Sequence, residues 1–415
     1  MIKNHLFFNE FSPWRFDLDS ALGSTLWDKN GNKLLDFTSG WNVTNLGWNN
    51  PEIIEAVIKK LKKSSYVPGW SDEASQNRLA AELEKVLPEG LNVFARATGG
   101  TEAIEEAIKT ARAFTGRRKI VSFKESYHGH SLGALALGYP AEGAIAKAVG
   151  PLPEGFLQID FPAVTAENQD KDGVLSTFAD RLESILMDAD VAAVVTEAGM
   201  ITGWGSTAVA PEGYLKLVRE LTKKYGTLLI IDEVGTGFSR LGQLWGMQWE
   251  KVTPDIVVFA KALSNGVIPI GAMVTTEIIA EKSSILTNIY STFGWLPAAC
   301  AAALKTLEIH RRDKIWEKAE RDGSYLQQTL KKELAQGGQK YGVRGIGMEI
   351  GLSLQSGTKG GGSWADKIVD RAYQKGLHLV GDRENNLQLM PPLTITQEEL
   401  SRGIDLLLET IKEVC

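Results

Sequence analysis

Short apolar runs alternate with amphipathic stretches through the middle of the chain. Six runs rich in β-branched residues have the length of buried strands, and each ends in a polar or glycine-containing turn: residues 92–95, 119–123, 191–196, 227–231, 256–259 and 270–274. Between several of them, apolar positions recur at helical spacing, as in residues 102–114 and 212–225. Near-continuous apolar strands that alternate with helices are typical of a mainly parallel sheet covered on both faces. The pattern therefore predicts an α/β fold.

Both ends of the chain have a different pattern. Residues 1–50 hold short strand-like pieces, with Asn30-Gly31 as a turn signal. Residues 298–312, 315–335 and 397–413 are periodic in the manner of helices, and short strand-like runs lie before the last of them. The chain ends are therefore predicted to add an α+β layer to the central sheet.

Composition and charge exclude several classes of protein. The 415 residues include 45 Lys and Arg and 51 Asp and Glu, a net charge of −6, which argues against a broad basic face for nucleic acid. The 43% hydrophobic and 23% charged content is that of a soluble globular protein. The N-terminus has no basic start followed by an apolar run, and no stretch of about 18 apolar residues follows, so we expect a cytoplasmic protein without membrane contact. Two cysteines and five scattered histidines give no disulfide framework and no metal-ligand spacing.

Polar clusters follow five of the predicted strands. Ligands of parallel sheets bind outside the carboxyl ends of the strands, so these clusters mark one candidate cleft. They are Thr98-Gly99-Gly100-Thr101, Tyr127-His128-Gly129, Glu197, Asp232-Glu233 and Ala260-Lys261.

Each cluster, taken alone, also has an ordinary structural interpretation. The turn at Thr98–Thr101 is either a simple helix cap or a helix start whose N–H groups bind an anion, and it matches neither common nucleotide-binding glycine motif. Asp232 follows four apolar residues, so it is either one half of a structural ion pair or the partner of a cationic ring nitrogen. Tyr127 and His128 are either core rings or a platform for a flat ligand.

Lys261 is the most informative of these residues. A lysine directly after a buried strand is costly unless it is paired, deprotonated or covalently used. Burial lowers the pKa of an amine and suits it to bond with a carbonyl carbon, although a lone lysine more often extends to solvent. An anion-binding helix start, a ring platform, an acid for a ring nitrogen and a buried amine together match pyridoxal 5′-phosphate.

The sequence around these clusters resembles the class III pyridoxal-phosphate aminotransferases, the ω-aminotransferase family. The resemblance covers nearly the whole chain. It is carried by LWDKNGNKLLDFTSG, ATGGTEAIEEAIKTAR, FKESYHGHSLG, LLIIDEVGTGFSRLGQLW, PDIVVFAKALSNG, STFGWLP and MPPLTIT. It implies an enzyme that moves an amino group from an amine or ω-amino acid to a keto acid by a ping-pong mechanism.

The resemblance also implies a role for each matching residue. Lys261 binds the cofactor aldehyde and shuttles the proton, and Asp232 pairs with the pyridine nitrogen. The remaining cofactor contacts that it implies are Gly99, Gly100, Thr101, Tyr127, His128, Glu197, Val234 and Thr292.

The implied architecture is fold type I of the pyridoxal-phosphate enzymes. It has a large cofactor-binding domain over residues 51–299 and a small domain formed by residues 1–50 and 300–415. Thr292 would reach the phosphate of the neighbouring subunit, so the resemblance implies a homodimer with shared active sites.

Departures from the family pattern concern the substrate. Ala198 and Gly235 replace a common Pro and a common Gln, and Thr202 stands near the place of a gateway Glu. Gln388 occupies a position that often carries a carboxylate-binding Arg, whereas Arg383 lies in a nearby loop.

Three further residues bear on the substrate contacts. Arg383 is the candidate that binds the carboxylate of the acceptor, and Trp41 and Trp70 are the candidates that shape an apolar amine pocket.

Two other functions stay open on the sequence. A 1,2-aminomutase, racemase or decarboxylase would use the same scaffold, because function lives in the site and not in the fold. A non-catalytic protein that binds the cofactor is the third possibility, although an intact Lys261 and Asp232 argue against it.

Overall fold

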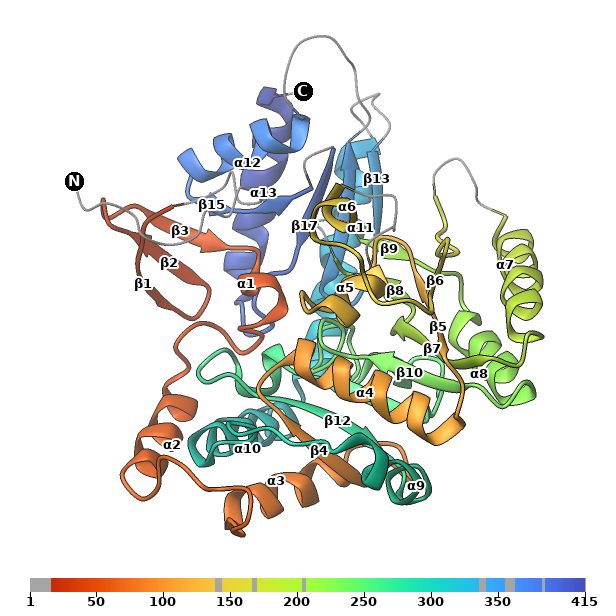
Figure 1. The fold of residues 1–415 in the computed structure, drawn as a ribbon. Helices are drawn as coiled ribbons and strands as arrows, with labels where there is room; N and C mark the ends of the chain where they lie inside the picture. The colour runs from red at the N-terminus through yellow and green to blue at the C-terminus, as the bar shows by residue number, and fades with distance from the viewer. Residues whose placement is uncertain are drawn as a thin grey trace.

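A seven-stranded sheet forms the centre of the molecule in the computed structural model (Figure 1). The structure describes residues 16–138, 144–165, 170–203, 207–335, 341–354, 363–382 and 385–414. In spatial order the strands of the central sheet are β4 (Val93–Ala97), β12 (Gly271–Thr275), β11 (Ile256–Phe259), β10 (Leu228–Asp232), β7 (Val191–Glu197), β5 (Lys119–Phe123) and β6 (Phe156–Ile159).

The strands are parallel except for β12, which runs antiparallel to both of its neighbours. Because β12 follows β11 without a crossover helix, the chain returns in the opposite direction. The predicted α/β fold with a mainly parallel sheet is confirmed. Of the seven strands of this sheet, only the short strand β6 was not predicted.

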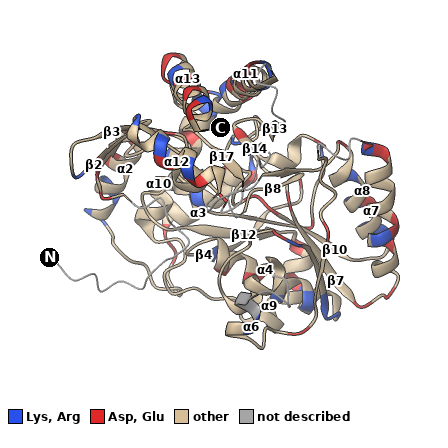
Figure 2. Ribbon diagram, turned by 90° about the horizontal axis from the view of Figure 1, so that it is seen from above, with Lys and Arg blue, Asp and Glu red and all other residues tan. Residues whose placement is uncertain are grey.

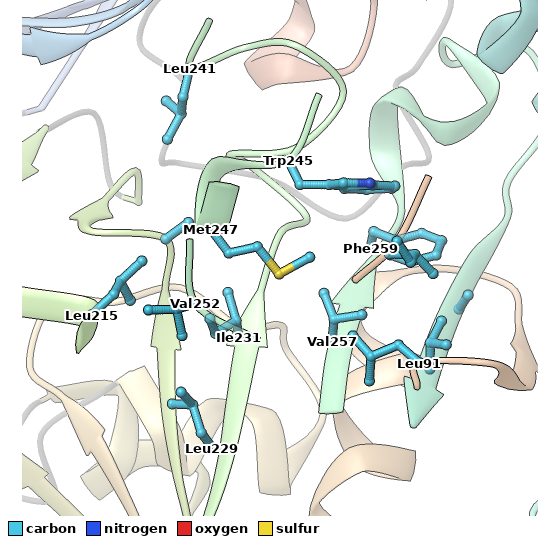
Figure 3. Close-up of a cluster of buried hydrophobic side chains, with 14 of the residues drawn as sticks. Leu91, Leu215, Leu229, Ile231, Leu241, Trp245, Met247, Val252, Val257 and Phe259 are labelled. Carbon is cyan, nitrogen blue, oxygen red and sulfur yellow. The ribbon is translucent and has the colours of Figure 1, made fainter. Parts of the chain in front are cut away.

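Helices cover both faces of the central sheet. Alternate residues of each strand point to opposite faces, and both sets are apolar, so both faces must be shielded from water. Ile230 packs on the side of α4 (Gly100–Thr115) and α9 (Glu277–Thr287). Leu229 and Ile231 pack on the other side, in the cluster shown in Figure 3 with Trp245, Met247 and Phe259. The side chains on both faces are fully buried, so the hydrophobic effect fixes the sheet between the helix layers.

The remaining helices are α1 (Ser39–Asn42), α2 (Pro51–Leu61), α3 (Ala74–Glu84), α5 (Leu132–Gly138), α6 (Ala144–Val149), α7 (Lys171–Leu186), α8 (Tyr214–Lys224), α10 (Pro297–Arg312), α11 (Ile315–Ala335), α12 (Trp364–Gln374) and α13 (Gln397–Val414). Acidic and basic residues gather on the outer helices α7, α8, α11 and α13 (Figure 2). Among the described residues, no helix is both long and apolar enough to cross a membrane.

The two chain ends lie together in a second part of the structure (Figure 1). One small sheet contains β1 (Leu18–Leu22), β2 (Thr25–Asp28), β3 (Lys33–Asp36) and β15 (Leu377–His378). The other contains β13 (Tyr341–Ile346), β14 (Glu349–Leu354), β17 (Asn386–Leu389) and β16 (Val380–Gly381). A two-stranded ribbon, β8 (Met200–Ile201) and β9 (Ala208–Val209), extends from the end of β7.

The predicted domain division at residues 50/51 and 299/300 stays a prediction. Strand β15 pairs with β3, which joins the two chain ends directly. Helix α10 contributes Ala299 and Ala303 to the core beside the central sheet, and Ala298 and Ala302 to the core of the chain ends. The second predicted boundary therefore falls inside one continuous helix.

The guanidinium of Arg240 holds four distant segments together. It is fully buried and donates to the carbonyl oxygens of Met348 (3.1 Å) and Pro391 (2.8 Å). It also donates to Ser39 Oγ (3.2 Å) and Asn45 Oδ1 (2.6 Å). Burial lowers the pKa of Arg240 to about 10, and Glu349 and Asp36 oppose this shift. A planar group with several donors is needed to satisfy so many acceptors at once.

We predict that Arg240→Lys lowers the free energy of unfolding by about 2–4 kcal/mol, because several buried acceptors lose their donor. Urea titration followed by intrinsic fluorescence measures the change. Arg312→Lys is the matched control, since Arg312 is exposed and pairs with Glu52 and Asp313 at the surface. Equally small effects of the two substitutions would contradict the conclusion that Arg240 holds the four segments together.

Candidate active site

The first component of the site is the turn between β4 and α4. The backbone N–H and the Oγ1 of Thr98 donate to Glu102 Oε2, at 2.6 Å each, which fixes the turn. No side chain caps the helix at Gly99, and a Cβ added to Gly99 would find no atom within 4 Å. The first N–H groups of a helix have no partner inside it, so this open end can bind an anion.

The second component is the pair of Asp232 and His128, both fully buried. Asp232 ends β10, and His128 lies in the loop after β5, so strands on either side of β7 supply the two residues. His128 Nδ1 lies 2.7 Å from Asp232 Oδ2, and the N–H of Val234 donates to Asp232 Oδ1 at 2.9 Å. Within the described residues, His128 Nε2 is buried without a hydrogen-bond partner.

The third component is the amine of Lys261, just after β11. Its φ of 38° lies in the left-handed region, which is strained for a residue with a side chain and is common at functional sites. Burial lowers the pKa of Lys261, and the charges of Glu197, Asp232 and Glu349 oppose this shift. No ion pair joins its Nζ to a carboxylate in the described part of the chain, and Lys261 lines the cavity described below, so the amine is available to a ligand.

One cavity of about 330 Å³ joins the three components. Eight of the predicted cofactor-binding residues line it: Gly99, Gly100, Thr101, Tyr127, His128, Asp232, Val234 and Lys261. Gly100 lets Val234 approach the helix start, since a Cβ there would lie only 3.1 Å from Val234 Cγ2. The Tyr127 hydroxyl forms a hydrogen bond with His130 Nδ1 at 2.8 Å.

Glu197 lies beside this cavity, next to Asp232 in the parallel ladder of β7 and β10. Its carboxylate accepts the N–H of Thr202 at 3.1 and 3.2 Å and also the Thr202 hydroxyl. Burial raises the pKa of Glu197 to about 7, with a smaller contribution from the charge of Asp232, while His128 and Thr202 oppose the shift. Among the described residues, no group of three or more His, Cys, Asp or Glu could hold a metal ion.

Within the described part of the chain, three predicted residues lie apart from the cavity. Thr292 is exposed on the loop before α10, and Trp70 is 85% exposed between α2 and α3. Trp41 is 36% exposed and donates through Nε1 to Gln388 Oε1 at 2.9 Å. Arg383 is outside the described residues, so its predicted role has no structural counterpart here.

Sequence reasoning missed two groups of residues around the site. Val43, Ser264, Gly266 and residues 268–270 also line the cavity. Ser264 and Gly266 belong to the glycine-containing turn after Lys261, which was the one local signal for them. No local signal marks the second group, in which buried Glu349 contacts Gln388 and Asn42.

The residues that line the cavity fit pyridoxal 5′-phosphate. The open start of α4 can bind the phosphate, and Asp232 can hold a proton on the pyridine nitrogen. Tyr127 and Val234 supply flat and apolar surfaces for the ring, and the Lys261 amine can bond to the aldehyde.

Comparisons with known proteins agree with this fit. The family model for class-III aminotransferases matches residues 9–411. An acetylornithine aminotransferase from Archaeoglobus fulgidus is 31% identical over 408 residues, which is 98% of both chains. A solved (S)-enantioselective ω-transaminase from Thermomicrobium roseum is 30% identical with a TM-score of 0.89, covering 99% of this chain and 96% of that one. An amine transaminase from an uncultivated Pseudomonas species, solved with pyridoxal phosphate bound, is 27% identical with a TM-score of 0.90, covering 100% and 99%.

The raised pKa of Glu197 predicts a pH-dependent stability in the cofactor-free protein. Because the folded-state pKa of about 7 exceeds the usual 4.5, the folded protein binds more protons between these values. Stability is therefore lost as the pH rises through this window, and Glu197→Gln removes the loss. From pH 5 to pH 8, the unfolding free energy of the parent should fall by about 2–3 kcal/mol relative to that of Glu197→Gln. Parallel stability curves for the two proteins would show that Glu197 is ionised throughout.

Proposed function

The chain belongs to the class III aminotransferases, and from this membership we propose that its donor is an amine or ω-amino acid and that Lys261 binds the cofactor. The enzyme is a pyridoxal 5′-phosphate-dependent aminotransferase of fold type I, so the predictions of family, fold class, activity and cofactor are confirmed. The assignment of roles to residues is supported by one observation above all. The amine, the buried acid and the open helix start face the same cavity.

Each component of the site has a task in amino transfer. Pyridoxal 5′-phosphate supplies an aldehyde that bonds to amines and a ring that withdraws electrons from the reacting carbon. The N–H groups at the start of α4 bind its phosphate, and Asp232 holds the proton on the pyridine nitrogen. His128 orients Asp232 through their 2.7 Å contact. Lys261 Nζ would take the proton from the Cα of the donor and pass it to the cofactor, which needs an amine that is not permanently charged.

The two half-reactions of a ping-pong exchange use this cavity in turn. Amino transfer is favoured over an aminomutase, racemase or decarboxylase by the family and by the names of the relatives. A non-catalytic protein is disfavoured because the reactive amine and its acid are both present. Trp41 and Trp70 remain the proposed pocket residues for the donor, and Arg383 the proposed contact for the keto acid. A cytoplasmic location also stays a prediction.

We also propose a homodimer with shared active sites. Large apolar side chains are exposed on the loop between α2 and α3, on the last turn of α9 and on the segment after it: Tyr66, Trp70, Ile285, Leu286, Tyr290 and Phe293. Some of them are in contact, because the Tyr66 and Phe293 rings are 6.2 Å apart and Tyr290 packs against Gly69. An exposed patch of this kind marks an interaction surface. Thr292 is exposed on the same segment, and its proposed role is to contact the phosphate in the site of a second copy.

Lys261→Ala tests the proposed role of the amine. We expect no turnover and no absorbance band from lysine-bound cofactor, because the amine that bonds to the aldehyde is missing. The test measures the spectrum and the product of one half-reaction with a panel of ω-amino acids, diamines and aryl amines, with pyruvate or 2-oxoglutarate as acceptor. Lys305→Ala on the outer face of α10 is the control, since its Nζ pairs with Glu308. Near-normal activity of Lys261→Ala would contradict the assignment.

Two variants separate assembly from cofactor binding at the apolar patch. Phe293→Asp should shift the protein from dimer to monomer in light scattering, because it places a charge in the interface. Thr292→Ala should leave the dimer intact and weaken cofactor binding about 2- to 13-fold, the effect of one neutral hydrogen bond.

Thr287→Ala is the control for Thr292, since the Thr287 hydroxyl donates within its own helix to the Ser283 carbonyl at 3.0 Å. A dimer that survives Phe293→Asp would place the interface elsewhere, and unchanged cofactor retention in Thr292→Ala would remove that residue from the phosphate site.

A further inference from the structure

A buried glutamine connects the candidate active site to the sheet of the chain ends. Gln388 in β17 is fully buried, and all of its polar atoms are engaged. Its Nε2 donates to Glu349 Oε1 at 2.6 Å and to the Thr202 carbonyl at 2.9 Å. Its Oε1 accepts the indole N–H of Trp41 at 2.9 Å.

The chemistry of these partners fixes the orientation of the Gln388 amide. A carboxylate and a carbonyl oxygen accept hydrogen bonds, so they take the two N–H groups of Nε2. The amide oxygen is left for the indole, which is only a donor. Glu349 is held in turn by Asn42 Nδ2 at 2.7 Å and by the Thr207 hydroxyl at 3.3 Å. The indole of Trp41 therefore has one defined partner in one defined orientation.

The backbone around Trp41 is strained in a way that supports this arrangement. Ser39, Gly40, Trp41 and Asn42 have φ values of 47°, 57°, 66° and 61°, so four successive residues adopt the left-handed conformation. Such a conformation is unfavourable for each residue with a side chain and persists only where neighbours enforce it. Contacts from distant segments enforce this one, since Ser39 Oγ donates to the Met390 carbonyl at 2.7 Å.

The turn that carries Trp41 is directly connected to the cavity. Val43, two residues after Trp41, lines the cavity that contains Lys261. Thr202, which accepts from Gln388, donates its own N–H to Glu197, and Glu197 lies beside Asp232 in the sheet. Three hydrogen bonds, through Gln388 and Thr202, thus connect the indole of Trp41 to the carboxylate of Glu197.

We propose that Gln388 is a positioning residue that holds the indole of Trp41 as a fixed wall of the donor pocket and so sets the preference for donors with a flat apolar group. This inference rests on the proposed function. A rigid indole offers a large apolar surface to an aromatic ring, whereas a small aliphatic donor gains little from it. Glu349 serves the same end by fixing the amide of Gln388.

The test compares an aryl amine, 1-phenylethylamine, with 2-aminobutane, which has the same branching but no ring. The efficiency of the half-reaction with each amine is measured in the parent, Gln388→Met, Trp41→Phe and the double variant. In Gln388→Met the ratio of the aryl to the aliphatic efficiency should fall about 3- to 10-fold, the effect of one lost hydrogen bond on the wall. The double variant should lose no more than the stronger single variant, because both changes remove the same contact.

Fluorine NMR of protein labelled with 5-fluorotryptophan tests the position of the indole without any turnover. The resonance that disappears in Trp41→Phe identifies Trp41, and this resonance should shift and broaden in Gln388→Met. Trp249→Phe is the matched control, since Trp249 is 42% exposed and donates through Nε1 to the Leu241 carbonyl at 2.6 Å. It should leave both the Trp41 resonance and the donor ratio unchanged.

Three results would overturn the proposal. The first is an unchanged Trp41 resonance in Gln388→Met. The second is an equal loss with both amines, which marks a general structural role. The third is additive losses in the double variant. Failure of the proposed function is a separate outcome, because then the parent itself would show no lysine-bound cofactor and no half-reaction with either amine, while the resonance would still report on Gln388.

Discussion

The burial of one amine is the constraint on which the site depends. Lys261 follows a fully buried strand, and a permanently charged lysine is costly there. Burial lowers the pKa of this amine, while Asp232 at the end of β10 and Glu197 at the end of β7 act in the opposite direction. Burial is the larger effect, so the amine that faces the cavity has a lowered pKa. That state suits a group that bonds to an aldehyde and then carries a proton.

The environment of this amine is assembled from both ends of the chain. Arg240 donates to segments near residues 39, 45, 348 and 391, and Gln388 links β17 to Trp41 and Thr202. These contacts are polar and buried, so each is costly to leave unmade and they specify one arrangement. The central sheet thus carries the chemistry, and the chain ends close the site around it.

Most of the residues that line the cavity could be named from the sequence because their signals are local. The apolar strands that lead to Asp232 and to Lys261, and the helix that begins at two glycines, can each be recognised from a few neighbouring residues. The antiparallel direction of β12 has no such signal, since an apolar run has the same appearance in either direction. The contacts of Glu349 and Gln388 were not predicted, because their partners lie up to about 350 residues away. Trp70 is 85% exposed outside the cavity, and nothing in the sequence distinguishes an exposed tryptophan from one that lines a cavity.

Chemical trapping of the cofactor tests the central claim most directly. The purified protein is loaded with pyridoxal 5′-phosphate, reduced with borohydride so that the bond to the amine becomes permanent, digested and mapped by mass spectrometry. The account predicts a single modified peptide with the cofactor on Lys261. Modification of a different lysine, or of none, would contradict it.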